Sequence, residues 1–191
     1  MHSLSSATPA THTVSPPLRN GRPTPTLIPY FGADPFEQHP QLKAIWPAPS
    51  QALAQEATRE ALQATGAGVF CGNYLAAVEH EVVGMTGFFV TEEGGEPYLR
   101  WHGVVPGWRG QGLSAQMLAL VVREVRRYLP QSRTLTELVP QTDYSGYLNR
   151  HFEKLGFKRA GALETFDWSP YQWQPWLLDL ANQRDFARYL I

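Results

Sequence analysis

The sequence YLRWHGVVPGWRGQGLSAQMLALVVREVRRYL, residues 98–129, combines the signals for a strand, a tight turn and a long helix. Residues 98–105 are rich in aromatic and β-branched side chains, which favour a strand. Pro106 ends this strand because it has no N–H to donate to a neighbouring strand. From Leu113 onward, apolar residues recur at helical spacing, which predicts an amphipathic helix up to about Leu129.

The turn between this strand and this helix contains Gly110 and Gly112. Because glycine has no Cβ, the backbone can bend tightly there and approach a ligand closely. The first N–H groups of the following helix have no partners within the helix, and the helix dipole adds partial positive charge at the same end. A helix start of this kind binds anions, so the segment predicts a site for a phosphate-containing ligand such as a pyrophosphate.

Residues 110–115, GQGLSA, satisfy the G-x-G-x-x-G/A fingerprint, which keeps a nicotinamide-dinucleotide protein as one alternative. That fingerprint opens a run of alternating strands and helices, whereas two hairpin-like strands come first here. The segment more closely resembles motif A of the GNAT superfamily, the acyl-CoA-dependent N-acetyltransferases. The matching residues are Val104, Pro106, Arg109 and Gly112, and Ser114 stands where the family has Gly or Ala.

This resemblance implies an α/β fold with a mixed, mostly antiparallel sheet, one parallel strand pair that splays apart, and helices on both faces. In GNAT proteins the pantetheine arm of the cosubstrate acetyl-CoA lies between the splayed strands and pairs with an exposed strand edge. The pyrophosphate lies on the glycine-rich turn. The positions that the resemblance assigns to acetyl-CoA here are Gly103, Val104, Val105, Arg109, Gly110, Gln111, Gly112, Leu113 and Ser114.

A second family segment, Asn-x-x-Ala-x-x-x-Tyr-x-x-x-Gly-Phe, corresponds to SGYLNRHFEKLGF at residues 145–157. Ser145 stands at the asparagine position, which contacts the pantetheine arm, and Phe152 stands at the tyrosine position, which protonates the leaving thiolate. Phe152 can pack against the cofactor but cannot donate a proton. Either the tyrosine is dispensable, because a thiol with a pKa near ~8.5 leaves tolerably as thiolate, or Tyr147 or Tyr144 replaces it. The alternative is a catalytically silent acyl-CoA-binding or regulatory module.

An attacking amine must be neutral, so a nearby base has to remove its proton. His102 is the first candidate, because period-two alternation places it on one strand face with Arg100 and Val104. Family bases lie at such even offsets before the motif valine, although a bulge would shift the parity. Glu137, on the next strand, is the second candidate. The implied mechanism is direct attack through a tetrahedral intermediate, with a backbone N–H near Val104 polarising the thioester carbonyl.

The rest of the chain is interpreted as a flexible Ser/Thr/Pro-rich tail at residues 1–24 and one GNAT-like domain over residues 25–191. The strands on either side of the long helix should be parallel, because the helix crosses between them. The expected strands are 26–31, 69–78, 82–91, 98–105, 134–139, 157–168 and 173–180, and the expected helical regions are 34–46, 50–66, 113–129, 142–155 and 182–191.

Bulk composition narrows the classes of function. The net charge of −1 argues against a nucleic-acid partner, and no apolar run approaches the ~18 residues of a membrane helix. Cys71 is the only cysteine, so no internal disulfide can form and a cytoplasmic location is expected. No grouping of His, Cys and carboxylate residues predicts a metal site. The expected partner is a small-molecule or peptide amine, and GNAT-like domains often form homodimers.

Overall fold

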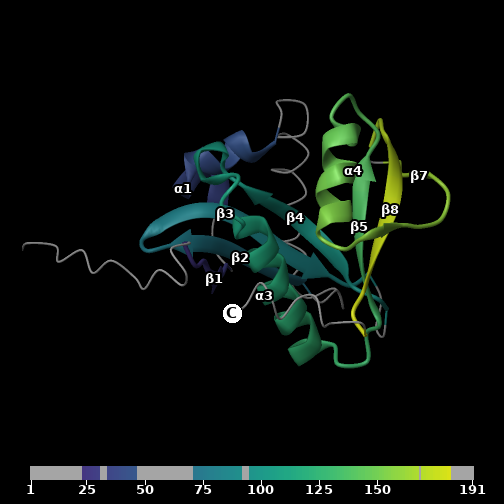
Figure 1. Cartoon of the computed structure of the whole chain (residues 1–191), viewed down its shortest axis with the longest axis horizontal. Helices are drawn as coiled ribbons and strands as arrows, with labels where there is room; N and C mark the ends of the chain where they lie inside the picture. Colours follow the sequence, from purple (N-terminus) through teal and green to yellow (C-terminus); the bar gives the residue numbers. More distant parts are fainter. Residues whose placement is uncertain (1–22, 31–33, 47–70, 92–94, 168, 182–191) are drawn as a thin grey trace, which may run out of the picture.

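The computed structural model describes residues 23–30, 34–46, 71–91, 95–167 and 169–181. The chain begins with strand β1 (Thr26–Pro29), the single turn α1 (Pro35–Gln38) and the 3-10 helix η1 (Pro40–Ile45). Strands β2 (Cys71–Val78), β3 (Glu81–Phe89) and β4 (Tyr98–Val104) follow. The short η2 (Pro106–Trp108) leads into helix α3 (Leu113–Tyr128), strand β5 (Thr134–Pro140) and helix α4 (Ser145–Lys154). Strands β6 (Lys158–Arg159), β7 (Glu164–Thr165) and β8 (Gln172–Asp179) complete the order (Figure 1).

The strands of the described residues join one mixed sheet in the order β1-β2-β3-β4-β5-β8-β6, with β7 paired to β8. Every pairing is antiparallel except β4 with β5, which is parallel as the crossover helix α3 requires. The predicted mixed sheet with one parallel pair is therefore confirmed. Figure 1 shows β4 and β5 meeting at one end and diverging towards the other.

One predicted strand is wrong. Residues 157–168 do not form a single strand but the two short pieces β6 and β7, which pair with different parts of β8. Gly161 lies between them with φ of 63°, a left-handed conformation that turns the chain out of the ladder. The expected helices at 50–66 and 182–191, and nearly all of the 1–24 tail, lie outside the described residues.

Helices cover both faces of the sheet, as neighbouring residues of β4 show. The His102 side chain reaches Ser114 of α3, whereas a side chain at Gly103 would collide with Ile45 of η1. Because consecutive strand residues face opposite sides, α3 and η1 lie on opposite faces. The face with α3 also carries α4, and one hydrophobic cluster joins Leu118 of α3 to Phe152 of α4. Within the described residues, no helix is long and apolar enough to cross a membrane.

Candidate functional site

The turn before α3 presents its backbone to solvent. Gly110 and Gly112 have φ of 78° and 81°, where a Cβ would cost roughly 1–2 kcal/mol. Both are exposed, and a Cβ built on Gly110 meets no atom within 4 Å. Gly112 is the N-cap of α3, and no side chain among the described residues caps the helix there. The first N–H groups of α3 therefore remain available to an anion.

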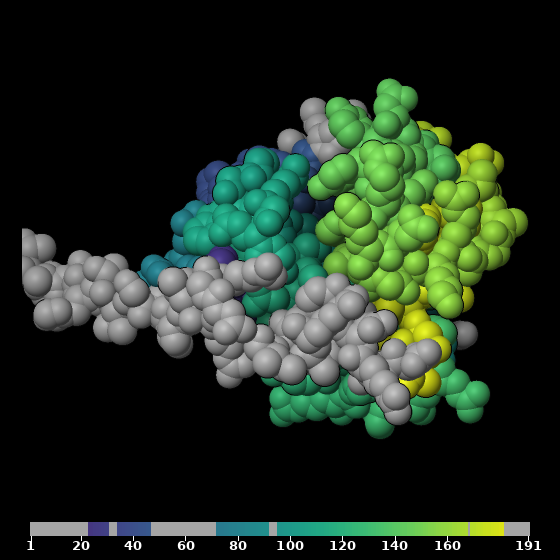
Figure 2. Space-filling model, viewed as in Figure 1, coloured from purple at the N-terminus to yellow at the C-terminus, as the bar shows by residue number. Residues whose placement is uncertain are grey.

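The gap beside this turn lies between the parallel strands. β4 and β5 share a single register pair, Tyr98 with Thr136, and separate beyond it. Val105 donates its N–H to Val83 of β3 at 2.9 Å, so alternation turns the N–H of Val104 towards the gap instead. Figure 2 shows the surface hollowed between the teal half, which includes the turn, and the green half, which includes α4. The gap can therefore receive an extended ligand arm.

The side chain of Arg109 fastens the turn to its surroundings. Its Nε donates to the carbonyl oxygen of Val104 at 3.1 Å, and its Nη2 donates to the carbonyl oxygen of Ile45 at 2.8 Å. The charge of Arg109 is thus held beside the uncapped start of α3 while its donors bind the protein backbone. A phosphate there would gain from the nearby positive charge as well as from N–H groups.

A bulge in β4 changes the predicted faces of this strand. Arg100 pairs with Gly87 and Gly103 pairs with Met85, so two residues of β4 face one residue of β3. Trp101, inside the bulge, has φ of 45°. The extra residue shifts the side-chain parity. The expectation that His102 and Arg100 share one face is therefore wrong.

The shifted parity turns His102 towards α3 and into a chain of hydrogen bonds. Its Nδ1 lies 2.9 Å from the hydroxyl oxygen of Thr86 on β3. Its Nε2 lies 2.8 Å from Oγ of Ser114, in the first turn of α3. The same Oγ lies 3.0 Å from Nε2 of His151 on α4. Thr86, His102, Ser114 and His151 thereby connect β3, β4, α3 and α4 across the site.

Both imidazoles in this chain are poor proton acceptors. Burial lowers the pKa of His102 to about 3, and the nearby His151 adds to this effect while the Ser114 hydrogen bond opposes it. Burial also lowers the pKa of His151, with further contributions from the charges of Lys154 and Arg109. Both rings are therefore neutral at neutral pH. Because both nitrogens of His102 are already hydrogen-bonded, this geometry weighs against His102 as the base.

Glu137 lies on β5, one residue beyond the point where β4 and β5 meet. The residue as a whole is half-buried, but Oε2 of its carboxyl group is buried and has no hydrogen-bond partner among the described residues. Burial raises its pKa well above the ordinary value. Its register partner on β8 is Trp176, whose Nε1 is likewise buried without a partner there. Two register partners near the narrow end of the gap thus each carry a buried polar atom with no hydrogen-bond partner among the described residues.

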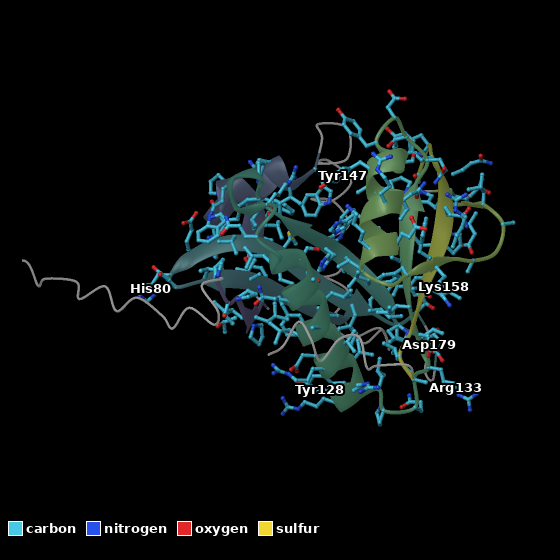
Figure 3. All side chains as sticks on the ribbon, in the orientation of Figure 1. His80, Tyr128, Arg133, Tyr147, Lys158 and Asp179 are labelled. Atoms are coloured by element: carbon cyan, nitrogen blue, oxygen red, sulfur yellow. The ribbon has the colours of Figure 1, made fainter. Side chains whose placement is uncertain are left out.

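The α4 residues that the resemblance assigned to the site take different positions. Ser145 uses its hydroxyl group within its own loop: the oxygen accepts from the Thr142 N–H, and the single O–H lies within reach of the carbonyl oxygens of Pro140 and Thr142. Phe152 is only 3% exposed, and its ring packs at 5.4 Å from those of Phe157 and His151. Tyr147 is 56% exposed and stacks on His151, with centroids 6.3 Å apart; Figure 3 shows it on α4.

His151 is the site residue that the sequence reasoning missed. It precedes Phe152 by one position, whereas the family segment specifies only the tyrosine position in this part of α4. A signal was present, because Ser114 replaces the small family residue at a position facing α4 and supplies a hydroxyl that two imidazoles share. Among the described residues, no group of three or more His, Cys, Asp or Glu could hold a metal ion.

The splayed strand pair and the uncapped glycine-rich helix start are the arrangement that the resemblance to GNAT proteins implies. The sequence profile described as the Acetyltransferase (GNAT) family matches residues 37–157, more than half of the chain. The chain therefore belongs to the GNAT acetyltransferase family. The mostly antiparallel sheet also rules out the dinucleotide-binding alternative, which requires a run of parallel strands. A search of curated proteins found no match.

Solved structures show the same fold at low sequence identity. A GNAT-family acetyltransferase from Desulfovibrio desulfuricans superposes with a TM-score of 0.62 at 19% identity, covering 82% of this chain and 99% of that one. A GNAT-family acetyltransferase from Elizabethkingia anophelis, with acetyl-CoA bound, gives 0.58 at 14% identity, with coverages of 82% and 98%. The ribosomal L7/L12 α-N-protein acetyltransferase RimL, in complex with coenzyme A, gives 0.57 at 16% identity, with coverages of 82% and 94%.

Proposed function

We propose that this protein transfers an acetyl or other short acyl group from acyl-CoA directly to a primary amine. The observation that carries the proposal is the single register pair between β4 and β5, which opens a gap ending at the uncapped start of α3. The uncapped N–H groups would bind the pyrophosphate. The pantetheine arm would follow the free edge of β4, where the Val104 N–H can polarise the thioester carbonyl.

Glu137 is the proton acceptor that the geometry favours. The amine nitrogen attacks the carbonyl carbon, the C–S bond breaks and its electron pair goes to sulfur, so one proton must leave nitrogen and one must reach sulfur. A carboxylate with a raised pKa accepts a proton more readily than an ordinary one. Glu137 has such a pKa and an unpartnered oxygen beside the gap, whereas both ring nitrogens of His102 are occupied.

A catalytically silent acyl-CoA-binding module is the second candidate, and Phe152 is the observation that favours it. The ring lies in the core among Phe157 and His151 and carries no proton to give to a thiolate. The enzyme remains the better-supported function, because a thiol of pKa near ~8.5 is a tolerable leaving group at neutral pH. The two candidates share the cofactor site and differ only in turnover.

Calorimetric titration of acetyl-CoA into the full-length protein, with NADH as the control ligand, tests the shared part. Saturable binding of acetyl-CoA alone is expected. Release of free thiol from acetyl-CoA is then measured with a panel of amines: a polyamine, an aminoglycoside, free amino acids and peptides with free N-termini. Thiol release that depends on one amine class supports the enzyme. Binding without release for any of them supports the silent module.

A further inference from the structure

His151 belongs to none of the steps above, yet it lies at the phosphate end of the site. Its Nε2 is 3.0 Å from Oγ of Ser114, the second residue of α3, whose first N–H groups are uncapped. The ring is held in place by the parallel stacking of Tyr147, at an interplanar angle of 5°. The other ring nitrogen, Nδ1, has no hydrogen-bond partner among the described residues. It is free to bind a ligand atom.

The charged groups around His151 form a positive region with an uncharged imidazole at its centre. Lys154 lies one turn further along α4, Arg109 projects from the glycine-rich turn, and both disfavour the imidazolium form. His102, beyond Ser114, is neutral as well. The start of α3 adds its own partial positive charge. In the free protein, protonation of His151 would therefore add a positive charge beside Arg109, Lys154 and the start of α3, so the neutral ring is favoured.

We propose that His151 takes up a proton when acyl-CoA binds and then donates Nδ1–H to a phosphate oxygen of the cofactor. This inference rests on the proposed function, because it takes acyl-CoA as the anion. The negative charge of the pyrophosphate reverses the repulsion from Arg109 and Lys154 and favours the imidazolium. The proton comes from solvent, and no covalent bond changes. His151 thus becomes a cofactor ligand only in the bound state.

Protonation of His151 also fixes the direction of the whole hydrogen-bond chain. An imidazolium donates from both nitrogens, so Nε2 of His151 would donate to Oγ of Ser114. The Ser114 hydroxyl group would then donate to Nε2 of His102, and Nδ1 of His102 would donate to the hydroxyl oxygen of Thr86. Cofactor binding at the phosphate end would thereby select one tautomer of His102 on β4, the strand that borders the gap.

Proton uptake on binding is the direct test. Acetyl-CoA is titrated at neutral pH in buffers that differ in ionisation enthalpy, and the dependence of the observed heat on the buffer gives the number of protons taken up. The wild type is expected to take up as much as ~1 proton more than the His151→Gln variant. Taking this difference removes any proton exchange by the cofactor's own phosphates. His80→Gln is the matched control, because His80 is exposed at the distant tip of the β2–β3 hairpin (Figure 3).

The pH dependence of the affinity gives a second readout. Wild-type affinity should strengthen as pH falls from about 8.5 to about 6, because only the bound state gains the proton. His151→Gln should bind about tenfold more weakly than wild type near pH 6 and equally near pH 8.5, as expected for one charge-assisted hydrogen bond. Equal proton uptake by the wild type and His151→Gln would overturn the inference alone. Failure of the wild type to bind acetyl-CoA would overturn the proposed function as well.

Discussion

The two walls of the gap between β4 and β5 are built in different ways. On the α3 wall, the proposed binding groups are backbone N–H groups at residues 110–114, of which 110–112 are exposed, and no side chain among the described residues caps the helix there. On the α4 wall, side chains at the family positions turn elsewhere: Ser145 into its own loop and Phe152 into the core. His151 reaches across to the other wall through its hydrogen bond with Ser114. A backbone site survives changes of side chain, whereas a side-chain site has to be rebuilt when its residues change.

Gly112→Glu should produce the largest effect, because it attacks the backbone wall. The substitution brings a carboxylate to the proposed pyrophosphate position and a Cβ to a residue with φ of 81°. Losing two hydrogen bonds to a charged group should lower the acetyl-CoA affinity by ~10²-fold or more. Calorimetry measures the affinity, and thermal unfolding shows whether the variant is folded.

Gly107→Glu is the matched control for this change. Gly107 is also exposed, a Cβ there meets no atom within 4 Å, and its φ is not positive. The Gly107→Glu substitution adds the same charge two residues before Arg109, away from the start of α3. Its acetyl-CoA affinity should fall by less than about tenfold, as expected for an exposed charge screened by solvent. Equal losses in the two variants would mean that overall charge, and not the helix start, controls binding.

Glu137→Gln should have the next largest effect, on turnover and not on binding. Removing a general base costs ~10²–10⁴-fold in rate, and acetyl-CoA affinity should stay unchanged. The same variant should be more stable at high pH. Folding raises the pKa of this carboxyl group. The unfolding free energy of the wild type therefore falls as pH rises from the unfolded pKa towards the folded one, by about 1.4 kcal/mol for each pH unit between them. Urea unfolding across this pH range should show the stability of the variant rising relative to that of the wild type. A turnover rate equal to that of the wild type would remove Glu137 from the mechanism.

His102→Gln separates a structural histidine from a catalytic one. In the wild type, the folded pKa of His102, about 3, lies below the unfolded value of 6.5. The stability that the neutral ring confers is therefore complete above pH 6.5 and is lost as pH falls from 6.5 to about 3. The unfolding free energy of the wild type should fall by up to a few kcal/mol on acidification, at about 1.4 kcal/mol for each pH unit, and that of the variant should fall by less. Its rate at neutral pH should fall by less than about tenfold, since the geometry gives it no free nitrogen. A loss as large as that of Glu137→Gln would restore His102 as the base.

The sequence predicted the backbone wall well because its signals are local. Glycine spacing, the proline that ends the strand and the apolar stripe of the helix each act within a few residues, and the turn, α3 and the parallel β5 followed from them. The α4 wall depends on how a helix sits on the sheet, which no local pattern reveals. The bulge at Trp101 is equally invisible in the sequence, yet one extra residue turned His102 from the expected face towards Ser114. The sequence also did not predict that residues 157–168 divide into the two-residue strands β6 and β7, since β6 pairs with a distant part of β8 and β7 with its nearby start.

Phe152→Tyr should have the smallest effect, and it tests whether the α4 wall can be returned to the family pattern by one change. The ring is 3% exposed and packed against Phe157 and His151, so the added hydroxyl group enters a tightly packed region. Without a hydrogen-bond partner it should cost ~1–3 kcal/mol of unfolding free energy and leave turnover unchanged. If turnover instead rises while acetyl-CoA affinity is constant, the hydroxyl group has reached the thiolate. The wall would then have retained the family geometry and lacked only the proton donor, and the silent module would be favoured if the wild type itself releases no thiol.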